Sequence, residues 1–356
     1  MKILHITTSL ANGGLENMLV DIANRQTIIG NQVAIMIINN NIETTILNRI
    51  ENSVKIYSIN RSIGSKSIIS LFKITLALLK LNDYNIIHCH SSAIGKKIRL
   101  ISKPKRILTI HGLNLDIPPL KHYHGLFAIS RAVKSDIEKR SSLSATVVYN
   151  GIDTYRVRIK NLTQLSNKEN FRIVQIGRLL SREKGQDLLI QALHLIVSKY
   201  EFQSLSVDFV GCGTSFKELN DLACSLQIEN KINFLGNKSR EWIYDNLSNY
   251  DVFVQPSRFE GFGLSVIEAM AAKLPVIVAS NGGPEEIVNY GEYGFVFSND
   301  DYIDLSDKIL ETIKLISNNK IQPIVDKAYQ YCIRNFNINS TALNYLNEYE
   351  RIITRR

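Results

Sequence analysis

Short apolar runs alternate with longer amphipathic stretches along the first 150 residues of the chain. After the first run, Leu15, Leu19 and Ile22 recur at the spacing of one helix face. Continuous apolar runs separated by helices are typical of buried strands in a parallel sheet, so this region is predicted to form an α/β domain. The expected strands are residues 2–8, 32–38, 85–90, 106–112, 125–130 and 145–151.

A polar, irregular stretch at 153–170 interrupts this pattern and is interpreted as an interdomain linker. The alternation then restarts, with an amphipathic helix at the end of the sequence. We therefore expect two Rossmann-like α/β domains, 1–155 and 156–335, facing a central cleft, and a C-terminal helix in 336–356 that packs back on the first domain. The elements expected after the linker are strands at 171–179, 206–211, 231–236, 251–257 and 275–280, and helices at 187–200 and 340–354.

The positive charge of the chain is concentrated in its first half. Residues 1–150 contain 19 Lys and Arg against 8 Asp and Glu, whereas the remaining residues contain 23 against 25. This asymmetry indicates that the first half meets an anionic partner. No apolar stretch reaches the roughly 20 residues that span a bilayer. The four cysteines form no CxxC pair, so neither disulfides nor a zinc site is predicted, and a reducing cytoplasm is expected.

One basic stretch, KKIRLISKPKR at 96–106, places six cations among apolar residues. It is interpreted either as a solvated surface helix or as a patch that docks on an anionic membrane. Lys66, Lys73 and Lys80 recur at seven-residue steps before it, on one face of an expected helix. The cations of the stretch are Lys96, Lys97, Arg99, Lys103, Lys105 and Arg106.

The stretch RFEGFGLSVIEAM at 258–270 places two carboxylates around a glycine turn at the end of an expected strand. Gly261 and Gly263 let a ligand approach bare backbone, and a helix expected from about Leu264 offers unpaired N–H groups to a phosphate. Glu268, about one turn inside that helix, suits a diol such as a ribose, while Glu260 faces what lies beyond the phosphates. The alternative is structural, with Glu268 capping local N–H groups and the glycines only forming the turn.

A second anion-binding element, GRLLSREKG at 177–185, follows the expected strand FRIVQI. It places Arg178 and Lys184 at a strand end, where ligands of parallel sheets bind. A guanidinium grips phosphate oxygens as a fork and an ammonium acts on them as a point charge.

These motifs resemble those of the retaining GT-B glycosyltransferases of glycosyltransferase family 4. The resemblance covers nearly the whole chain and is strongest over 174–290. Besides GRLLSREKG, its elements are NGGLE at 12–16, YNGID at 149–153, EGFGLSVIE at 260–268 and SNGGPEEIV at 280–288.

The resemblance implies a role for each matching residue. Arg178 and Lys184 would neutralise the donor diphosphate, Glu268 would bind the ribose, and Glu260 would contact the transferred sugar. His111 would lie at the sugar or acceptor edge, and it joins Glu260, Arg178 and Lys184 as a catalytic candidate. No metal and no cofactor is expected, because Arg, Lys and the helix N-terminus supply the positive charge. The donor-binding residues implied in this way are Gly14, Gly177, Arg178, Lys184, Glu260, Gly261, Phe262, Gly263, Leu264 and Glu268.

Histidines are crowded into the first domain, but their spacing matches no metal-ligand pattern. Strand-end histidines are more often engaged in local hydrogen bonds, and an acceptor contact from His88 or His90 is also consistent with their position. The histidines considered are His88, His90, His111, His122 and His124.

The resemblance implies transfer of a hexose or N-acetylhexosamine from a nucleotide-diphosphate sugar, with retention, to form an α-glycosidic bond. The acceptor is expected to be a lipid-linked saccharide of a lipopolysaccharide O-antigen or capsule. We expect the enzyme at the inner face of the cytoplasmic membrane, as a peripheral protein. Two alternatives stay open: a nucleotide-sugar epimerase of GT-B fold, and a basic nucleic-acid-binding protein. Against the latter, no nucleic-acid-recognition signature is present and the best motifs lie in the acidic half.

Overall fold

The structure is a computed structural model, and it describes residues 1–11, 13–65, 72, 74–77, 79, 81–92, 103–117, 122–161 and 170–354. The chain divides into two units. The first unit comprises Met1–Ile152 together with Asn337–Arg356, and the second comprises Asp153–Phe336. The last helix of the chain therefore belongs to the same unit as the first strand.

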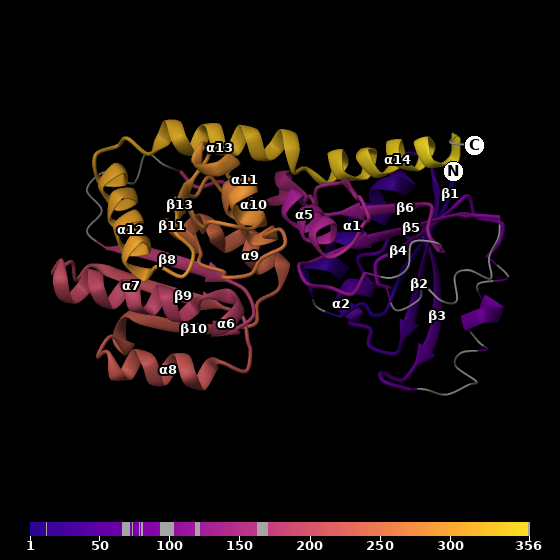
Figure 1. Ribbon diagram of the computed structural model, residues 1–356. Helices are drawn as coiled ribbons and strands as arrows, with labels where there is room; N and C mark the ends of the chain where they lie inside the picture. Colours follow the sequence, from indigo (N-terminus) through magenta and orange to yellow (C-terminus); the bar gives the residue numbers. More distant parts are fainter. Residues whose placement is uncertain are drawn as a thin grey trace. The chain divides into compact units, whose positions relative to one another are not determined.

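A seven-stranded parallel sheet forms the centre of the first unit (Figure 1). Its strand order is β3-β2-β1-β4-β5-β6-β7, so the chain moves outward in one direction from β1 and then in the other from β4. This order creates a switch point between β1 and β4. The strands are β1 Lys2–Thr7, β2 Gln32–Asn39, β3 Lys55–Arg61, β4 Ile86–Cys89, β5 Lys105–Ile110, β6 Gly125–Ala128 and β7 Thr146–Val147.

Two long helices, α1 (Gly14–Ile28) and α14 (Ile338–Thr354), pack together on one face of this sheet. The apolar cluster beneath them contains Ile3, Ile86 and Ile107 from neighbouring strands, and Tyr345 and Tyr349 from α14. Both tyrosines are fully buried, which makes α14 part of this core. The shorter helices described in this unit are α2 Thr44–Leu47 and α5 Arg131–Arg140.

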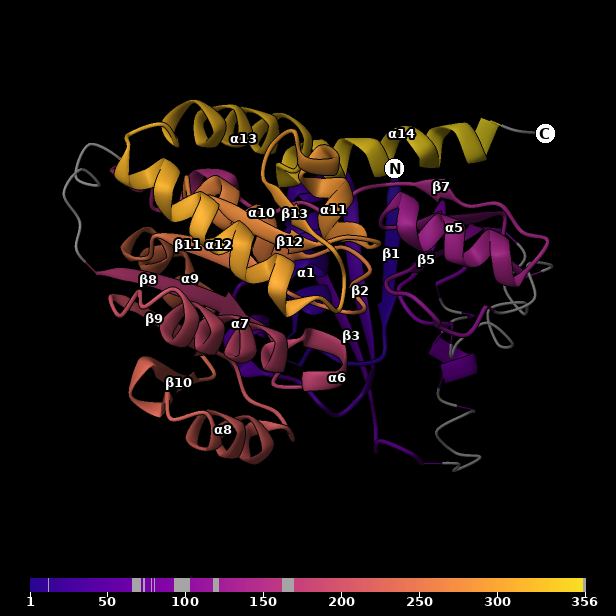
Figure 2. The same cartoon turned by 60° about the vertical axis from the view of Figure 1, so that its left-hand side comes forward.

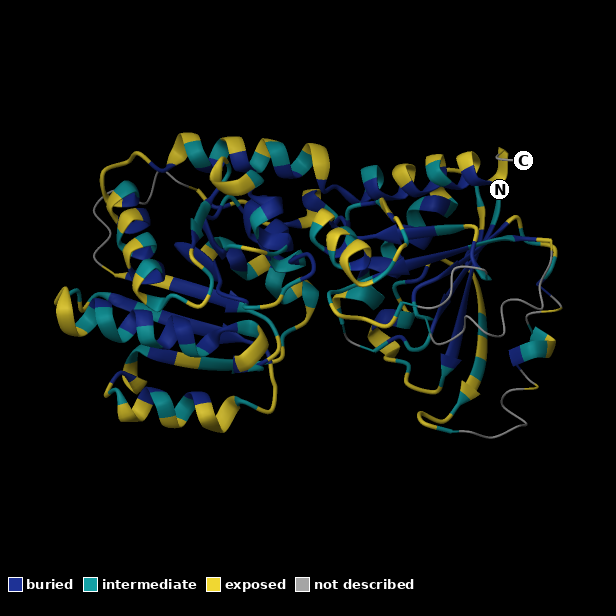
Figure 3. Cartoon of the chain, in the orientation of Figure 1, coloured by how far each residue is buried: buried dark blue, intermediate teal, exposed yellow. Residues whose placement is uncertain are grey.

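The second unit contains a six-stranded parallel sheet of order β10-β9-β8-β11-β12-β13. Its switch point lies between β8 and β11. Its four inner strands, β9, β8, β11 and β12, are buried along most of their length (Figure 3), in keeping with the continuous apolar runs of the sequence. The strands of this sheet are β8 Phe171–Ile176, β9 Leu205–Val210, β10 Ile232–Gly236, β11 Val252–Gln255, β12 Val276–Ala279 and β13 Phe295–Phe297.

Helices cover both faces of this second sheet. Val252 and Val254 face a core built with α7, α8 and α12, and α7 and α12 lie side by side in Figures 1 and 2. Gln255 points the other way, where its side chain accepts a hydrogen bond from Ser265 of α10. The helices are α6 Ser181–Lys184, α7 Gln186–Lys199, α8 Phe216–Ser225, α9 Arg240–Asn246, α10 Leu264–Ala271, α11 Gly283–Ile287, α12 Tyr302–Ser317 and α13 Gln322–Asn335.

The predicted α/β class with two parallel-sheet domains is confirmed, and two strands were missed. The missed strands are β3 and β13. β3 is a polar edge strand whose residues are mostly exposed, so it lacks the apolar run that marks the others. β13 has only three residues, FVF. The predicted linker is anchored at its start, because buried Lys160 pairs with Asp251 at 3.2 Å and therefore holds this part of the chain on the second unit. Residues 162–169 of that linker lie outside the described residues.

Candidate functional site

Two loops follow the neighbouring strands β8 and β11 at the switch point of the second sheet. The loop after β8 begins at Gly177 and leads into α6, and the loop after β11 begins at Pro256 and leads into α10. Because both strands run in the same direction, both loops leave the same edge of the sheet, which is where parallel sheets bind ligands.

An ion pair between Lys184, the last residue of α6, and Glu260 joins that helix to the loop after β11. The Lys184 Nζ donates to Glu260 Oε2 at 2.5 Å, and the two side chains are 16% and 20% exposed. A backbone hydrogen bond from Phe259 N to Glu183 O, 3.2 Å long, joins the same helix and loop. The sequence places these two charges 76 residues apart, and the fold brings them into contact.

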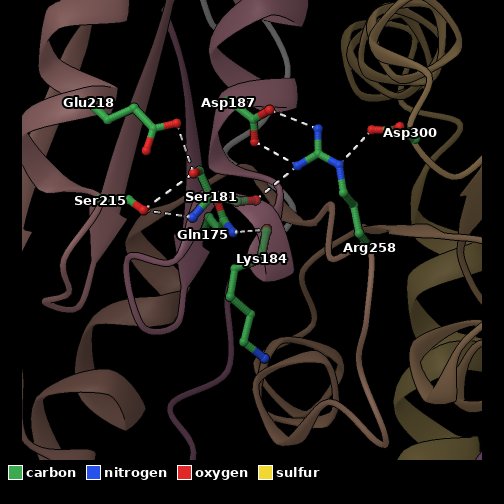
Figure 4. A network of polar contacts seen from close by, with 8 residues as sticks. All are labelled: Gln175, Ser181, Lys184, Asp187, Ser215, Glu218, Arg258 and Asp300. Carbon is green, nitrogen blue, oxygen red and sulfur yellow. Dashed lines mark hydrogen bonds and ion pairs between the residues drawn. The ribbon is translucent and has the colours of Figure 1, made fainter. Parts of the chain in front are cut away.

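Arg258 holds the β11 loop against α6 and α7 (Figure 4). Its guanidinium binds Asp187 with two hydrogen bonds of 2.8 and 2.7 Å, and also donates to Ser181 O and to Asp300. The hydrogen bonds to Asp187 raise the pKa of Arg258 further above its usual value, so this group stays charged. The bidentate geometry fixes the direction in which the loop leaves β11.

Further hydrogen bonds hold the helix α6 through the buried side chains of Gln175 and Ser181 (Figure 4). Gln175 on β8 donates to Lys184 O at 2.9 Å. Ser181 contacts Ser215 and donates to Glu218 at 3.1 Å. Lys184 is thus carried by a backbone that is fixed at both ends of a short helix.

The turn before α10 depends on Gly263 within it and on Gly283 at the start of α11, which packs against it. Gly263, the N-cap of α10, has φ +107°, a left-handed conformation that other residues adopt only with strain, and it offers no capping side chain. A Cβ at Gly283 would lie 2.4 Å from Gly261 O, so only glycine lets α11 approach this loop. Gly283 N also donates to Glu260 O at 3.0 Å. The first-turn N–H groups of α10 therefore have no capping side chain at Gly263, as expected of an anion-binding helix end.

Two further predicted residues, Glu268 and Phe262, are buried. Glu268 is buried, 9% exposed, four residues after the start of α10 at Leu264. Phe262 is 3% exposed and packs edge-on against Phe336, so its side chain belongs to the core and only its backbone could meet a ligand.

Arg178 and Gly177 lie at the open side of the β8 loop. Arg178 is exposed, and within the described part of the chain no hydrogen bond or ion pair of its guanidinium is seen. A Cβ at Gly177 would meet nothing within 4 Å, so the chain is open on that side, while the Gly177 N–H is bonded to Val210 O at 2.9 Å. The second unit therefore gathers one exposed cation, a Lys–Glu pair, a buried carboxylate and an uncapped helix end around the carboxyl ends of β8 and β11.

In the first unit, Gly14 is the first residue of α1 and follows the N-cap Gly13. His111 follows β5 and belongs to a buried chain of hydrogen bonds. His90 Nδ1 lies 3.0 Å from His111 Nε2, His90 Nε2 lies 3.0 Å from His5 Nδ1, and His5 Nε2 lies 2.8 Å from Gln26 Oε1. His5 was not among the predicted residues, although strand register places it directly beside His88.

His88 belongs to a second, adjoining set of hydrogen bonds. Its Nδ1 lies 2.6 Å from the Tyr349 hydroxyl and its Nε2 lies 2.6 Å from Thr109 Oγ1. Burial lowers the pKa of His5 to about 4 and that of His111 to about 3, and it holds the pKa of His88 and His90 well below the ordinary histidine value. All four imidazoles are therefore neutral at pH 7.

Three of these histidines are close enough together to be considered as metal ligands. One ring nitrogen from each of His5, His88 and His90 lies within 4.8 Å of the others. However, both ring nitrogens of each residue are already engaged in the hydrogen bonds given above. The donor set fits a satisfied polar network better than a metal centre, because coordination would break these bonds and would add a buried charge without a carboxylate to offset it.

The remaining histidines and the basic stretch lie apart from this network. His124 Nδ1 accepts from Arg106 N at 3.0 Å. Of the six cations predicted to form a patch, Lys103 is exposed, whereas Lys105 and Arg106 are partly buried and start β5. Arg106 is thus a poor surface contact. Lys96, Lys97 and Arg99, like Lys66, Lys73 and Lys80, lie outside the described residues.

Two known glycosyltransferase families match this chain. Residues 159–329 match the family described as glycosyl transferases group 1, and residues 12–156 match glycosyltransferase family 4. The chain belongs to the GT-B glycosyltransferases of family 4. The first match covers the loops after β8 and β11. The second covers the NGGLE motif and three histidines of the network, His88, His90 and His111, but not His5.

Curated relatives of this glycosyltransferase include an uncharacterized glycosyltransferase of Methanocaldococcus jannaschii, 27% identical over 73% of this chain and 73% of that one. The capsular polysaccharide biosynthesis glycosyltransferase CapM of Staphylococcus aureus is 28% identical over 60% of this chain and 62% of its own. Among solved structures, HepE of Anabaena in complex with UDP and glucose superimposes with a TM-score of 0.78 at 21% identity, covering 98% and 99% of the two chains. This last likeness shows the fold.

No helix in the described part of this glycosyltransferase combines the length and the apolar character that a membrane crossing requires.

Proposed function

We propose that the chain is a retaining glycosyltransferase that moves a hexose or N-acetylhexosamine from a nucleotide-diphosphate sugar to a lipid-linked saccharide. The observation that carries this proposal is the Lys184–Glu260 ion pair beside the uncapped start of α10. A cation and a helix N-terminus at one sheet edge suit a diphosphate, and a carboxylate next to them suits the hydroxyls of the sugar attached to it.

In this proposal each charge has a separate task. Arg178, Lys184 and the backbone at Gly263 bind the diphosphate and stabilise the negative charge that develops on it as the sugar leaves, and Gly177 leaves room for it because it has no side chain. Glu268, deeper along α10, accepts hydrogen bonds from the ribose hydroxyls. Glu260 receives the transferred sugar. Because Lys184 contacts Glu260 directly, the arriving diphosphate shares an ammonium that already orients this carboxylate.

Retention of anomeric configuration gives an α-linked product from an α-linked donor. It is achieved either by return of the acceptor from the same face or by a covalent intermediate. In the second case Glu260 is the nucleophile we assign. No metal is part of this proposal, because the cations that would face the diphosphate come from the chain itself.

Support for a surface-polysaccharide acceptor comes from the relative named for capsular polysaccharide biosynthesis and from the basic first half of the chain. A UDP-sugar is the first donor to try, because HepE was solved with UDP and glucose. For Gly14 and His111 of the first unit, the roles implied by the family resemblance stay predictions. We place the enzyme at the inner face of the cytoplasmic membrane, held by its basic residues.

The experiment that tests this function has two steps. Calorimetry with a panel of nucleotide sugars first identifies the donor, and incubation with lipid-linked acceptors then yields a product whose anomeric configuration is read by NMR. We expect transfer with an α linkage. A β-linked product contradicts retention. Conversion of the nucleotide sugar to its epimer without an acceptor would support the epimerase alternative, and binding of nucleic acid in a mobility shift without sugar transfer would replace the proposal.

A further inference from the structure

The buried chain Gln26–His5–His90–His111 has a direction, because each imidazole can donate from only one nitrogen. Its three links are 2.8, 3.0 and 3.0 Å long, all within ordinary hydrogen-bond distance. The imidazoles are neutral, so each carries one N–H and one lone pair. In such a chain the proton position on one ring determines the proton position on the next.

The direction is set at the Gln26 end. Gln26 Oε1 faces His5 Nε2, and a carbonyl oxygen only accepts, so His5 carries its proton on Nε2. His5 Nδ1 must then accept, which puts the proton of His90 on Nε2. His90 Nδ1 in turn accepts, which puts the proton of His111 on Nε2.

The Gln26 amide is fully buried, and its oxygen is the atom that lies within hydrogen-bond distance of His5. Its nitrogen has no hydrogen-bond partner among the described residues. The contact between Oε1 and His5 is therefore the one through which this amide acts on the chain.

Exposure increases along the chain toward His111. Gln26 and His5 are 0% exposed and His90 is 5% exposed, whereas His111 is largely but not fully buried. Within the described residues, no side chain or backbone group is seen to hydrogen bond His111 Nδ1. The chain therefore ends on a nitrogen whose lone pair has no partner among the described residues.

We propose that Gln26, acting through His5 and His90, is a positioning residue that holds His111 in the Nε2–H tautomer and so presents its Nδ1 as a hydrogen-bond acceptor. An acceptor at this place binds a hydroxyl donor and rejects a carbonyl. With the amide of Gln26 reversed, every proton in the chain would shift and His111 would present a donor instead. The use of this nitrogen for a sugar hydroxyl rests on the proposed function, while the tautomer itself does not.

The wild-type protein tests the tautomer directly. In the full chain labelled with ring-¹⁵N histidine, long-range ¹H–¹⁵N spectra distinguish protonated from unprotonated ring nitrogens. We expect a protonated Nε2 and an unprotonated Nδ1 at His5, His90 and His111, with ¹⁵N–¹⁵N couplings across both His–His hydrogen bonds. A protonated Nδ1 at His111 overturns the proposal.

A Gln26→Met variant tests the source of the direction. Methionine fills similar space but removes the acceptor, so a second set of signals with a protonated Nδ1 should appear at His90 and His111. Thr109→Val is the matched control, because it removes a similarly buried partner of His88 but leaves Gln26 Oε1 in place, so it should shift the His88 signals and leave the tautomers of His5, His90 and His111 unchanged. Unchanged His111 signals in folded Gln26→Met would show that Gln26 does not set the tautomer.

The transfer assay then tests the use of this nitrogen. In Gln26→Met we expect kcat to fall about twofold or more with the donor KM unchanged, because only part of the population presents an acceptor. Unchanged kcat beside the altered spectrum overturns a role in transfer. Absence of transfer in the wild-type protein would contradict the proposed function, whereas the wild-type spectrum decides the tautomer independently.

Discussion

Lys184, at the end of the short helix α6, and Glu260, on the loop after β11, form an ion pair of 2.5 Å, and both side chains are mostly withdrawn from solvent. Arg178, on the loop before Lys184, is exposed instead. The two cations assigned to the diphosphate thus start from different states, since Lys184 already has a partner and Arg178 has none among the described residues. This difference separates the consequences of removing each.

Lys184→Ala and Arg178→Ala should each lower turnover by about a hundredfold or more, the usual cost of losing one charge contact to the transition state. Lys184→Ala also leaves Glu260 without its partner, so it should lower the thermal midpoint slightly, whereas Arg178→Ala should leave it unchanged. Steady-state kinetics and thermal unfolding measure both effects. The control is Arg182→Ala, which removes an exposed cation from α6, the helix that carries Lys184. Its turnover and thermal midpoint should stay near those of the wild type. Near-normal turnover in both variants would remove the diphosphate role.

The two glutamates should separate in a binding experiment. Glu268→Gln should weaken binding of the bare nucleoside diphosphate, because an amide accepts from ribose hydroxyls less strongly than a carboxylate. Glu260→Gln should bind this ligand at least as tightly as wild type, because it frees Lys184 from its ion pair, yet it should impair transfer. Calorimetry with the diphosphate decides. Equal losses of affinity in both variants would contradict the separate roles.

The apolar runs and glycine turns made much of the second unit predictable from sequence. The run 251–257 contains β11, and α10 begins at Leu264 as expected. Contacts between distant residues were not predictable. Arg258 is the first residue of the motif RFEGFGLSVIEAM, but its partner Asp187 is 71 residues away in the sequence and no local pattern links the two.

The histidine network shows the same limit in the first unit. His5 lies alone in the first apolar run, far from the histidines at 88–124. Only the parallel pairing of β1 with β4 sets His5 beside His88, and only the packing of α1 supplies Gln26. Ile3 and His5 are two residues apart on one strand, so their side chains point to the same face of the sheet. This could have suggested that the His5 ring points into the core, but it does not identify the partners of the ring.

Activity should survive EDTA, because Lys184, Arg178 and the start of α10 supply positive charge without a bound ion. The assay compares transfer before and after chelation, with magnesium or manganese added back. Complete loss of transfer activity that either metal restores would show that carboxylates or histidines of the chain bind a metal ion. The His5, His88 and His90 group would then be the first place to examine, by His88→Phe.

Stability should decrease as the pH falls from about 6.5 to 5. The pKa of His5 and His111 is depressed in the folded state, to about 4 and about 3, so in this range the unfolded chain binds more protons than the folded one. Stability contributed by neutral burial is thus complete above the unfolded pKa and is lost on acidification. Each histidine contributes up to about 1.4 kcal/mol per pH unit. Denaturant unfolding at pH 7.5, 6 and 5 measures the slope. A flat profile, or an unchanged slope in His5→Gln, would contradict it.

The first half of the chain should bind anionic membranes reversibly. Its excess of positive charge and the stretch 96–106 motivate this prediction. Each basic residue near an anionic surface contributes about 1 kcal/mol, and the attraction is screened over about 8 Å at physiological salt. The protein should therefore sediment with anionic vesicles at low salt and be released at high salt.

A matched pair of variants tests whether the stretch itself is responsible. Neutralising Lys96, Lys97, Arg99, Lys103 and Lys105 should reduce sedimentation, and Arg106 is left in place because the Nε of its guanidinium is buried. The control neutralises five exposed lysines of the second unit and so makes the same change in net charge. If both variants lose binding equally, the attraction comes from net charge alone; if the first sediments like wild type, the stretch is only a solvated surface and the lipid-linked acceptor loses its main support. The control lysines are Lys199, Lys217, Lys314, Lys320 and Lys327.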